Sequence, residues 1–578
     1  MKIHAVKDLA EHQRKRSCLI EGSAIRSDAG WWTPVAVRAA HLKEARTCGS
    51  LRLSMAPAPR FETKLICVWH MQSRKRPPWM HKANGGWSRM LRDYLRLQLL
   101  ASDAGLLTSG VPIQIGEEAI LLYANLRILL TDGDGHRIGL QWKGANSTKP
   151  CFRHWNLLRL DDEMGRLRHA EGYVDIAESD PTKFQQWQEA DFQTMIDVVV
   201  EASERFAAGT MVRARLDEVQ KAFGFAATSD GLLACPLLRR FIQWQQVLRY
   251  DWVHTFLSDG VLCGPAWRLV EAAERAGIAT QNDIYGFLKE DWQVPLHRRW
   301  KSRQLWRLFS EHNAQANAAA ETIKCCCNEL LAMYGLSKHW AQHRLPRKHL
   351  VAAEMNIFLK ACESVDHIRR AKRSLTTMPV ASASTRRCLQ EWMDAHKSHY
   401  GNDHLKPKSH WAFDVCDHLE SDPMVIDAFV IERLHLRVKA EAEFIKRLEN
   451  FESSVLARVV NAQVESSQKE AGCGLIGRTA PLPGAPDAIV ADRMEVFGAH
   501  FSVGDFIARG DQIAQVQACA DENGELFVIA DAWHKEASDD VRQSWRSAGA
   551  RCVWPASELH EVISWKLLAN GCVIVIDC

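Results

Sequence analysis

A glycine- and proline-rich stretch at residues 466–489 divides the chain into two parts with different sequence patterns. The stretch contains Gly472, Gly474, Gly477, Pro481, Pro483, Gly484 and Pro486. Glycine and proline interrupt regular elements, so we expect a linker here. Most of residues 183–465 have helical patterns, whereas residues 490–578 contain short apolar runs separated by turn residues, which are typical of strands. The sequence therefore predicts a small, barrel-like β domain at the end of the chain.

The length of the chain excludes a single hydrophobic core, because 578 residues exceed the roughly 250–300 residues at which cores stop growing. We expect an α+β, multidomain protein. The expected segments are an irregular arm at residues 1–60, the first part of an α/β core at 61–200, a mainly helical region at 201–465, the linker at 466–489 and the β-rich domain at 490–578. The last segment is expected to fold independently of the rest.

Local patterns predict individual elements in the first core segment. Apolar residues at helical spacing predict a helix over residues 87–101. The alternation in Val111–Ile115 predicts a strand, and Asp132–Gly135 has the composition of a turn, followed by an extended run over Ile138–Trp142. The sequence thus predicts a helix followed by several short strands.

Cysteine content and hydropathy indicate an intracellular protein. The 17 cysteines are odd in number and include the run Cys325–Cys327, which favours reduced thiols in a reducing compartment. No apolar run reaches the roughly 18 residues that a membrane helix needs, and the first residues lack the apolar stretch of a secretory signal. We therefore expect a nuclear or cytoplasmic protein without a membrane partner.

Basic residues are clustered, although the formal net charge is only +3. The clusters lie at Arg14–Arg16, Arg74–Arg76, Arg298–Arg303 and Arg369–Arg373. Such clusters neutralise phosphates and release counterions, although any one of them is also typical of a solvated helix face. Four clusters in one chain favour a polyanionic partner.

Three short segments, taken in order, resemble one protein family. They are Lys143–Asn156 (KGANSTKPCFRHWN), Tyr250–His254 (YDWVH), and His404–His410 (HLKPKSH) followed by Asp427–His435 (DAFVIERLH). Together they resemble transposon-encoded proteins of some unicellular algae, which are more distantly similar to the transposases of CACTA-type and KDZ-type DNA elements. The small C-terminal β domain is also similar to one in these algal proteins.

The resemblance implies an RNase H-like α/β core interrupted by a large helical insertion. It also implies phosphodiester hydrolysis and strand transfer with two Mg²⁺ ions. Carboxylates suit this chemistry because Mg²⁺ prefers oxygen ligands, and two ions about 3.5–4 Å apart activate the attacking oxygen and stabilise the leaving one. Three acidic residues from distant parts of the chain would have to converge.

The resemblance assigns two of these acidic residues. Asp251 corresponds to the acidic residue of an Asp-x-Met-His motif, and Glu432 to the third acidic position, in a Phe-x-x-Glu-Arg pattern. The alternatives are a helix N-cap for Asp251 and a solvated helix-surface residue for Glu432. Glu44 is the candidate for the first acid, although its surroundings match the family poorly. Asp132 and Asp134 precede glycines and are therefore interpreted as turn residues.

Cys151 and His154 have the spacing of half a zinc site. They stand where the family typically has Cys-x-x-Cys, and Zn²⁺ accepts both ligand types. Cys235 and His169 are candidates for the other half. The alternative is that Cys151 and His154 are unbound residues in a loop.

Five basic residues of the matching motifs are candidate phosphate contacts. They are His254, Lys406, Lys408, His435 and Lys439. The segment with Lys406 and Lys408 also fits a surface loop that leads into a helix.

These observations predict a transposase-like or transposase-derived nucleic-acid-binding protein with an impaired catalytic site, because only two of three acids stand at family positions. If it is active, it would be a Mg²⁺-dependent transposase or nuclease encoded by a mobile element. The expected partners are DNA, a second copy of the chain, and a protein bound by the C-terminal domain. The alternative is a non-enzymatic helical scaffold with a β-barrel interaction module.

Overall fold

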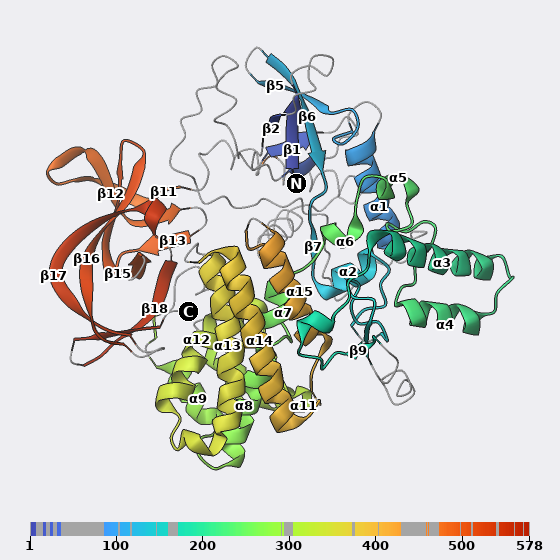
Figure 1. The fold of residues 1–578 in the computed structure, drawn as a ribbon. Helices are drawn as coiled ribbons and strands as arrows, with labels where there is room; N and C mark the ends of the chain where they lie inside the picture. The colour runs from blue at the N-terminus through green and yellow to red at the C-terminus, as the bar shows by residue number, and fades with distance from the viewer. Residues whose placement is uncertain are drawn as a thin grey trace. The chain divides into compact units, whose positions relative to one another are not determined.

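The computed structural model describes most of the chain (Figure 1). The described residues are 86–159 (except 102–104, 116–117 and 146), 172–290, 292–293, 305–428 (except 373–375, 403 and 423), 458, 461 and 473–576 (except 497–498, 510–511, 539–542, 560 and 570), together with four short strands before residue 36. The structure is mixed α and β and divides into two compact units. Unit 1 comprises Met1–Asp251 and Ile426–Gln468, and unit 2 comprises Trp252–Val425 and Lys469–Cys578.

The described residues of unit 1 form three small sheets and a strand hairpin. An antiparallel sheet has the order β2 (Arg16–Cys18), β1 (Lys2–Val6), β6 (Glu118–Asn125) and β5 (Val111–Ile115). The hairpin pairs β3 (Ser23–Arg26) with β4 (Trp32–Val35), and β8 (Leu157–Leu158) pairs in parallel with β9 (Val174–Asp175). The strand predicted at Val111–Ile115 is confirmed, while the segment expected to be an irregular arm contains β1 to β4.

A second parallel pair in unit 1 joins distant parts of the chain. Strand β7 (Leu129–Thr131) pairs with β10 (Leu248–Tyr250), with Thr131 opposite Tyr250. Helix α2 (Gly133–Gly139) follows β7 directly, so the extended run expected from Ile138 begins as helix instead.

The helices of unit 1 have the apolar faces that their sequences predict. In α1 (Gly86–Leu100), Leu91, Leu95 and Leu99 recur every four residues and are buried, as expected for an amphipathic helix. This confirms the helix predicted at 87–101. The remaining helices are α3 (Glu189–Ala207), α4 (Arg213–Phe223), α5 (Pro236–Arg239) and α6 (Trp244–Val247), with a 3-10 turn, η3 (Pro181–Lys183).

Unit 2 begins with a helical region. Its helices are α7 (Trp252–Leu257), α8 (Cys263–Arg275), α9 (Gln281–Lys289), α11 (Glu311–Ala320), α12 (Cys327–His339), α13 (Ala352–Lys372), α14 (Met378–Tyr400) and α15 (Pro407–Ser421), with short turns η5 (Leu305–Phe309), η6 (Trp340–Arg344) and η7 (Lys348–Val351). The long helices α13, α14 and α15 pack in succession (Figure 1). None of the described helices has the length and apolar character needed to cross a membrane.

The C-terminal part of unit 2 is an antiparallel sheet. Its strands are β11 (Gly474–Leu482), β12 (Ala485–Val496), β13 (Ala499–Ser502), β14 (Phe506–Arg509), β15 (Gln512–Glu522), β16 (Glu525–Ser538), β17 (Gln543–Pro555), β18 (Glu561–Leu567) and β19 (Val573–Ile576). The pairing order β15-β14-β18-β19-β17-β16 returns to β15, because β16 also pairs with β15. Residues 466–489, which were expected to form a linker, contain β11 and the start of β12.

Two backbone hydrogen bonds connect this sheet to the helical region of unit 2. The N–H of Gln293 donates to the Trp565 carbonyl at 2.9 Å, and the N–H of Trp565 donates to the Gln293 carbonyl at 3.0 Å. Beside them, the Glu290 carboxylate pairs with Lys566 and Arg344. The sheet thus has a specific attachment within its own unit.

Candidate metal centres

Two acidic residues directly follow the paired parallel strands of unit 1. Asp132 follows Thr131 at the end of β7, and Asp251 follows Tyr250 at the end of β10. Paired parallel strands lie about 4.8 Å apart, so the register brings these two aspartates side by side at one sheet edge. Sequence reasoning interpreted Asp132 as a turn residue, because the pairing of strands more than a hundred residues apart leaves no local signal.

Asp132 begins a helix and is partly buried. Its Oδ1 accepts a hydrogen bond from the Gly135 N–H at 2.6 Å, as in a helix N-cap. A Cβ added at Gly135 would lie 2.8 Å from Cβ of Thr131, so only glycine lets α2 start this close to the strand. The Asp-Gly pattern that resembled a turn is the first turn of α2.

Asp251 is buried, and it contacts the segment that carries the third family motif. Asp251 is only 2% exposed. Its Oδ1 accepts a hydrogen bond from the Ala428 N–H at 3.0 Å. Asp427, the residue before Ala428, is also buried. Segments 177 positions apart therefore meet at the end of β10.

Several predicted site residues lie outside the described part of the chain. These are Glu44, His169, Glu432, His435 and Lys439. The predicted proximity of Asp251 and Glu432 therefore stays a prediction, although Ala428, four residues before Glu432, contacts Asp251.

Cys151 and His154 lie in a buried loop of unit 1. Cys151 Sγ is 3.6 Å from Nδ1 of His154. The sulfur also accepts hydrogen bonds from the Arg153 N–H at 3.3 Å and from the Tyr250 hydroxyl at 3.6 Å. The pair predicted as half of a zinc site is therefore close enough to share an ion.

His410 and Asp414 form a second buried pair, one turn apart on α15 of unit 2. Both side chains are fully buried, and His410 Nε2 lies 3.8 Å from Oδ2 of Asp414. Pro407 occupies the first turn of α15, a position that proline favours. The helix therefore starts before His410, and Lys406 precedes it as the N-cap, which is the loop-to-helix arrangement of the alternative interpretation.

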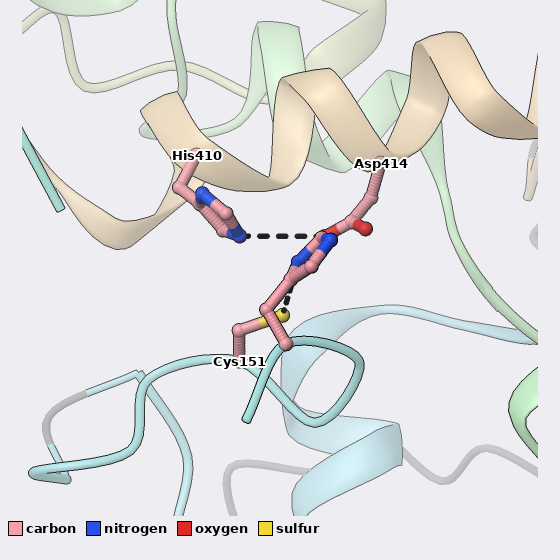
Figure 2. A group of neighbouring side chains, drawn as sticks. Cys151, His410 and Asp414 are labelled. Carbon is pink, nitrogen blue, oxygen red and sulfur yellow. Dashed lines mark hydrogen bonds and ion pairs between the residues drawn. The ribbon is translucent and has the colours of Figure 1, made fainter. Parts of the chain in front are cut away.

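Each unit thus contributes its own buried pair of candidate ligands, and Figure 2 shows His410 and Asp414 along α15. Sulfur, imidazole and carboxylate ligands are those that zinc accepts in four-coordinate sites. Cys235, a predicted partner of Cys151, is a buried residue directly before α5. The sequence analysis did not single out Asp414, although its i,i+4 spacing from His410 was the available signal.

Lys406 and Lys408, two of the basic residues that were predicted to contact phosphate, have contacts within unit 2. Lys406 pairs with Asp259. Lys408 donates to the backbone carbonyls of His254 and Ser258, and burial lowers the pKa of its ammonium group. Both lysines thus connect the start of α15 to the end of α7 and the turn after it.

No protein-family model, curated protein or solved structure matches this chain.

Proposed function

We propose that this chain is a transposase-derived DNA-binding protein in which Asp132 and Asp251 bind divalent metal ions. The observation that carries the proposal is the placement of both aspartates directly after adjacent parallel strands. Asp132 takes the role of the first acid, for which Glu44 was the sequence candidate. The third acid comes from the segment that follows Ala428, with Glu432 as its candidate.

The donor set fits Mg²⁺, because its ligands are carboxylate oxygens. Adjacent strands lie about 4.8 Å apart, so carboxylates that follow two such strands can reach ions that are about 3.5–4 Å apart. Such ions, when bound, activate a water or hydroxyl nucleophile and stabilise the leaving oxygen of a phosphodiester. The two aspartates and the third-motif segment would hold them at the sheet edge.

The chain order supports an interrupted core of the RNase H-like kind. Unit 1 is built from Met1–Asp251 and Ile426–Gln468, so the helical segment Trp252–Val425 is inserted between the second and third acidic motifs. This is the order that the resemblance implies. We also propose that the C-terminal sheet is barrel-like, because its pairings return from β16 to β15.

Zinc is the second metal that we propose for this protein. The buried pair Cys151 and His154 of unit 1 supports it, since thiolate and imidazole suit Zn²⁺ better than Mg²⁺. An ion bound there would stabilise this loop and would leave the chemistry to the carboxylates.

A Mn²⁺ titration with purified full-length protein tests the carboxylate site. Asp132→Asn and Asp251→Asn should each weaken binding strongly, while asparagine keeps the hydrogen bonds to Gly135 and Ala428. Asp134→Asn is the matched control, because Asp134 is exposed and pairs with Arg137 on the surface of α2. Equal Mn²⁺ binding in all variants would exclude the site and favour the non-enzymatic scaffold. Mg²⁺-dependent cleavage of duplex DNA, lost in Asp132→Asn, would establish activity.

A further inference from the structure

We propose that Glu363, His367 and Cys388 form a second transition-metal site, located between α13 and α14 of unit 2. One ligand atom from each of these residues lies within 4.8 Å of the other two. The site is separate from the aspartates of unit 1 and does not depend on the function proposed above.

Helix geometry brings the three side chains together. Glu363 and His367 are four residues apart on α13, so they share one face of the helix. Cys388 is buried on α14, which packs along α13. The three ligands therefore come from two rigid elements, which favours a defined coordination geometry.

The two oxygens of the Glu363 carboxylate have different neighbours. Oε2 accepts a hydrogen bond from Lys360 at 3.2 Å, while Oε1 faces His367 Nε2 at 4.0 Å. Lys360 also pairs with Glu391 on α14, so its charge is shared between two carboxylates. Lys360 thus fixes the orientation of Glu363 as an outer-shell partner does in known metal sites, and it leaves Oε1 directed at the imidazole.

The imidazole of His367 provides the independent sign of a ligand. Its Nε2 is buried and has no hydrogen-bond partner among the residues that the structure describes. The 4.0 Å separation from Glu363 is too long for a hydrogen bond, and buried polar atoms of this kind are rarely left unsatisfied. A metal ion between His367, Glu363 and Cys388 would satisfy this nitrogen.

The ligand types select the class of metal. Sulfur and imidazole together favour Zn²⁺, Co²⁺ or a similar ion over Mg²⁺ or Ca²⁺. Bonds of about 2.0–2.3 Å place tetrahedral ligand atoms roughly 3.5 Å apart, so modest side-chain rotations complete the site. Burial and the Glu363 carboxylate raise the pKa of Cys388 to about 12, so metal binding displaces one thiol proton.

The site is accessible and leaves one position open. The Glu363 side chain is 40% exposed and the His367 side chain 21% exposed, so an ion can enter from solvent. Three protein ligands and one water are the arrangement of zinc sites that bind exchangeable ligands. The site would therefore take a water molecule or a small anion as its fourth ligand.

Cobalt absorption tests this proposal in the full-length protein. Cys151→Ser serves as the background, because it removes the thiol of the other candidate zinc site. In that background, Co²⁺ should produce thiolate-to-cobalt absorption that saturates at one ion per chain. Adding Cys388→Ser should abolish this absorption, and adding His367→Gln should weaken Co²⁺ binding by roughly tenfold or more.

The matched control is His399→Gln. His399 of α14 faces Glu354 of α13 with 2.9 Å between Nε2 and Oε1, so it is a histidine–glutamate pair between the same helices without a thiol. This variant should bind Co²⁺ normally. Zn²⁺ should also raise the melting temperature of the Cys151→Ser protein. The increase should be smaller when His367→Gln is added, a substitution at a partly exposed position. Absent cobalt–thiolate absorption in the background, or an unchanged signal in Cys388→Ser, would overturn the proposal.

Discussion

The carboxylate of Asp251 accepts a hydrogen bond from the backbone N–H of Ala428 at 3.0 Å, although the two residues are 177 positions apart. This contact joins the two chain segments of unit 1, which are separated in sequence by Trp252–Val425. Asp251 therefore has a structural role in addition to the metal-binding role proposed for it, and the two roles can be separated by mutation.

Asp251→Ala is expected to destabilise the protein more than Asp251→Asn. Alanine leaves the buried Ala428 N–H without its acceptor, which costs roughly 1–3 kcal/mol, whereas asparagine keeps an acceptor oxygen. Chemical denaturation followed by circular dichroism measures the difference. Equal loss of stability in both variants would show that the hydrogen bond to Ala428 contributes nothing.

Gly135→Ala is expected to destabilise unit 1 by roughly 1–3 kcal/mol. The new Cβ would lie 2.8 Å from Cβ of Thr131 and 3.0 Å from Oδ1 of Asp132, so α2 would shift away from β7. Gly286→Ala is the control, because an added Cβ there meets nothing within 4 Å. The control should gain up to about 1 kcal/mol, since Gly286 lies within α9 and alanine favours helices. Equal melting temperatures for both variants would contradict this expectation.

Stability is expected to fall as the pH decreases below about 6.5. Burial lowers the pKa of His136 to about 4, and the Asp132 carboxylate partly opposes this effect. Between pH 6.5 and 4 the unfolded chain therefore binds a proton that the folded chain does not, so the contribution is complete above 6.5 and is lost towards 4. The full shift corresponds to roughly 3 kcal/mol. Denaturation at several pH values should show a slope that His136→Gln reduces; an unchanged slope would argue against this assignment.

DNA binding is expected to be salt-sensitive and largely independent of the aspartates. Raising the salt concentration from about 50 to about 200 mM should weaken binding by an order of magnitude or more, because phosphate contacts release counterions. Asp132→Asn should retain this binding while it loses Mn²⁺. Fluorescence anisotropy with labelled duplex DNA measures both effects, and no binding at low salt would contradict the proposed DNA partner.

The sequence analysis expected residues 490–578 to fold independently, but the strands of this sheet begin at Gly474. A fragment of residues 469–578 is therefore expected to melt cooperatively, whereas a fragment of residues 490–578 is not. The longer fragment contains the whole sheet, while the shorter one lacks β11 and the first part of β12. Strand β12 pairs with β11, β13 and β15, so its truncation removes pairings on both sides. Thermal melts of the two fragments measure this, and two equally cooperative melts would contradict it.

Local patterns predicted single elements but not their pairing. Leu91, Leu95 and Leu99 indicated α1 because their spacing follows the helix repeat. The same logic assigned residues 466–489 to a linker, because Pro481 and Gly484 interrupt regular patterns. In the structure β11 is an edge strand, which tolerates proline, and Gly484 has the positive φ of 87° that the turn before β12 needs.

The candidate sites were only partly predictable for the same reason. Cys151 and His154 are close in sequence, so their spacing suggested a shared metal. Asp132 gave no such signal, because its position beside Asp251 depends on the pairing of β7 with β10. Glu363, His367 and Cys388 were missed because α13 and α14 must pack before the thiol meets the other two ligands.

The discontinuity of unit 1 also sets an order of events during synthesis. Ribosomes add roughly 5–20 residues per second, so Ala428 emerges about 10–35 s after Asp251 has been made. During that interval β10 is already synthesised, but Ala428, which donates a hydrogen bond to Asp251, is not. The intervening helices of unit 2 can already fold. Truncation anywhere before residue 428 would therefore leave unit 1 without the segment that contacts Asp251.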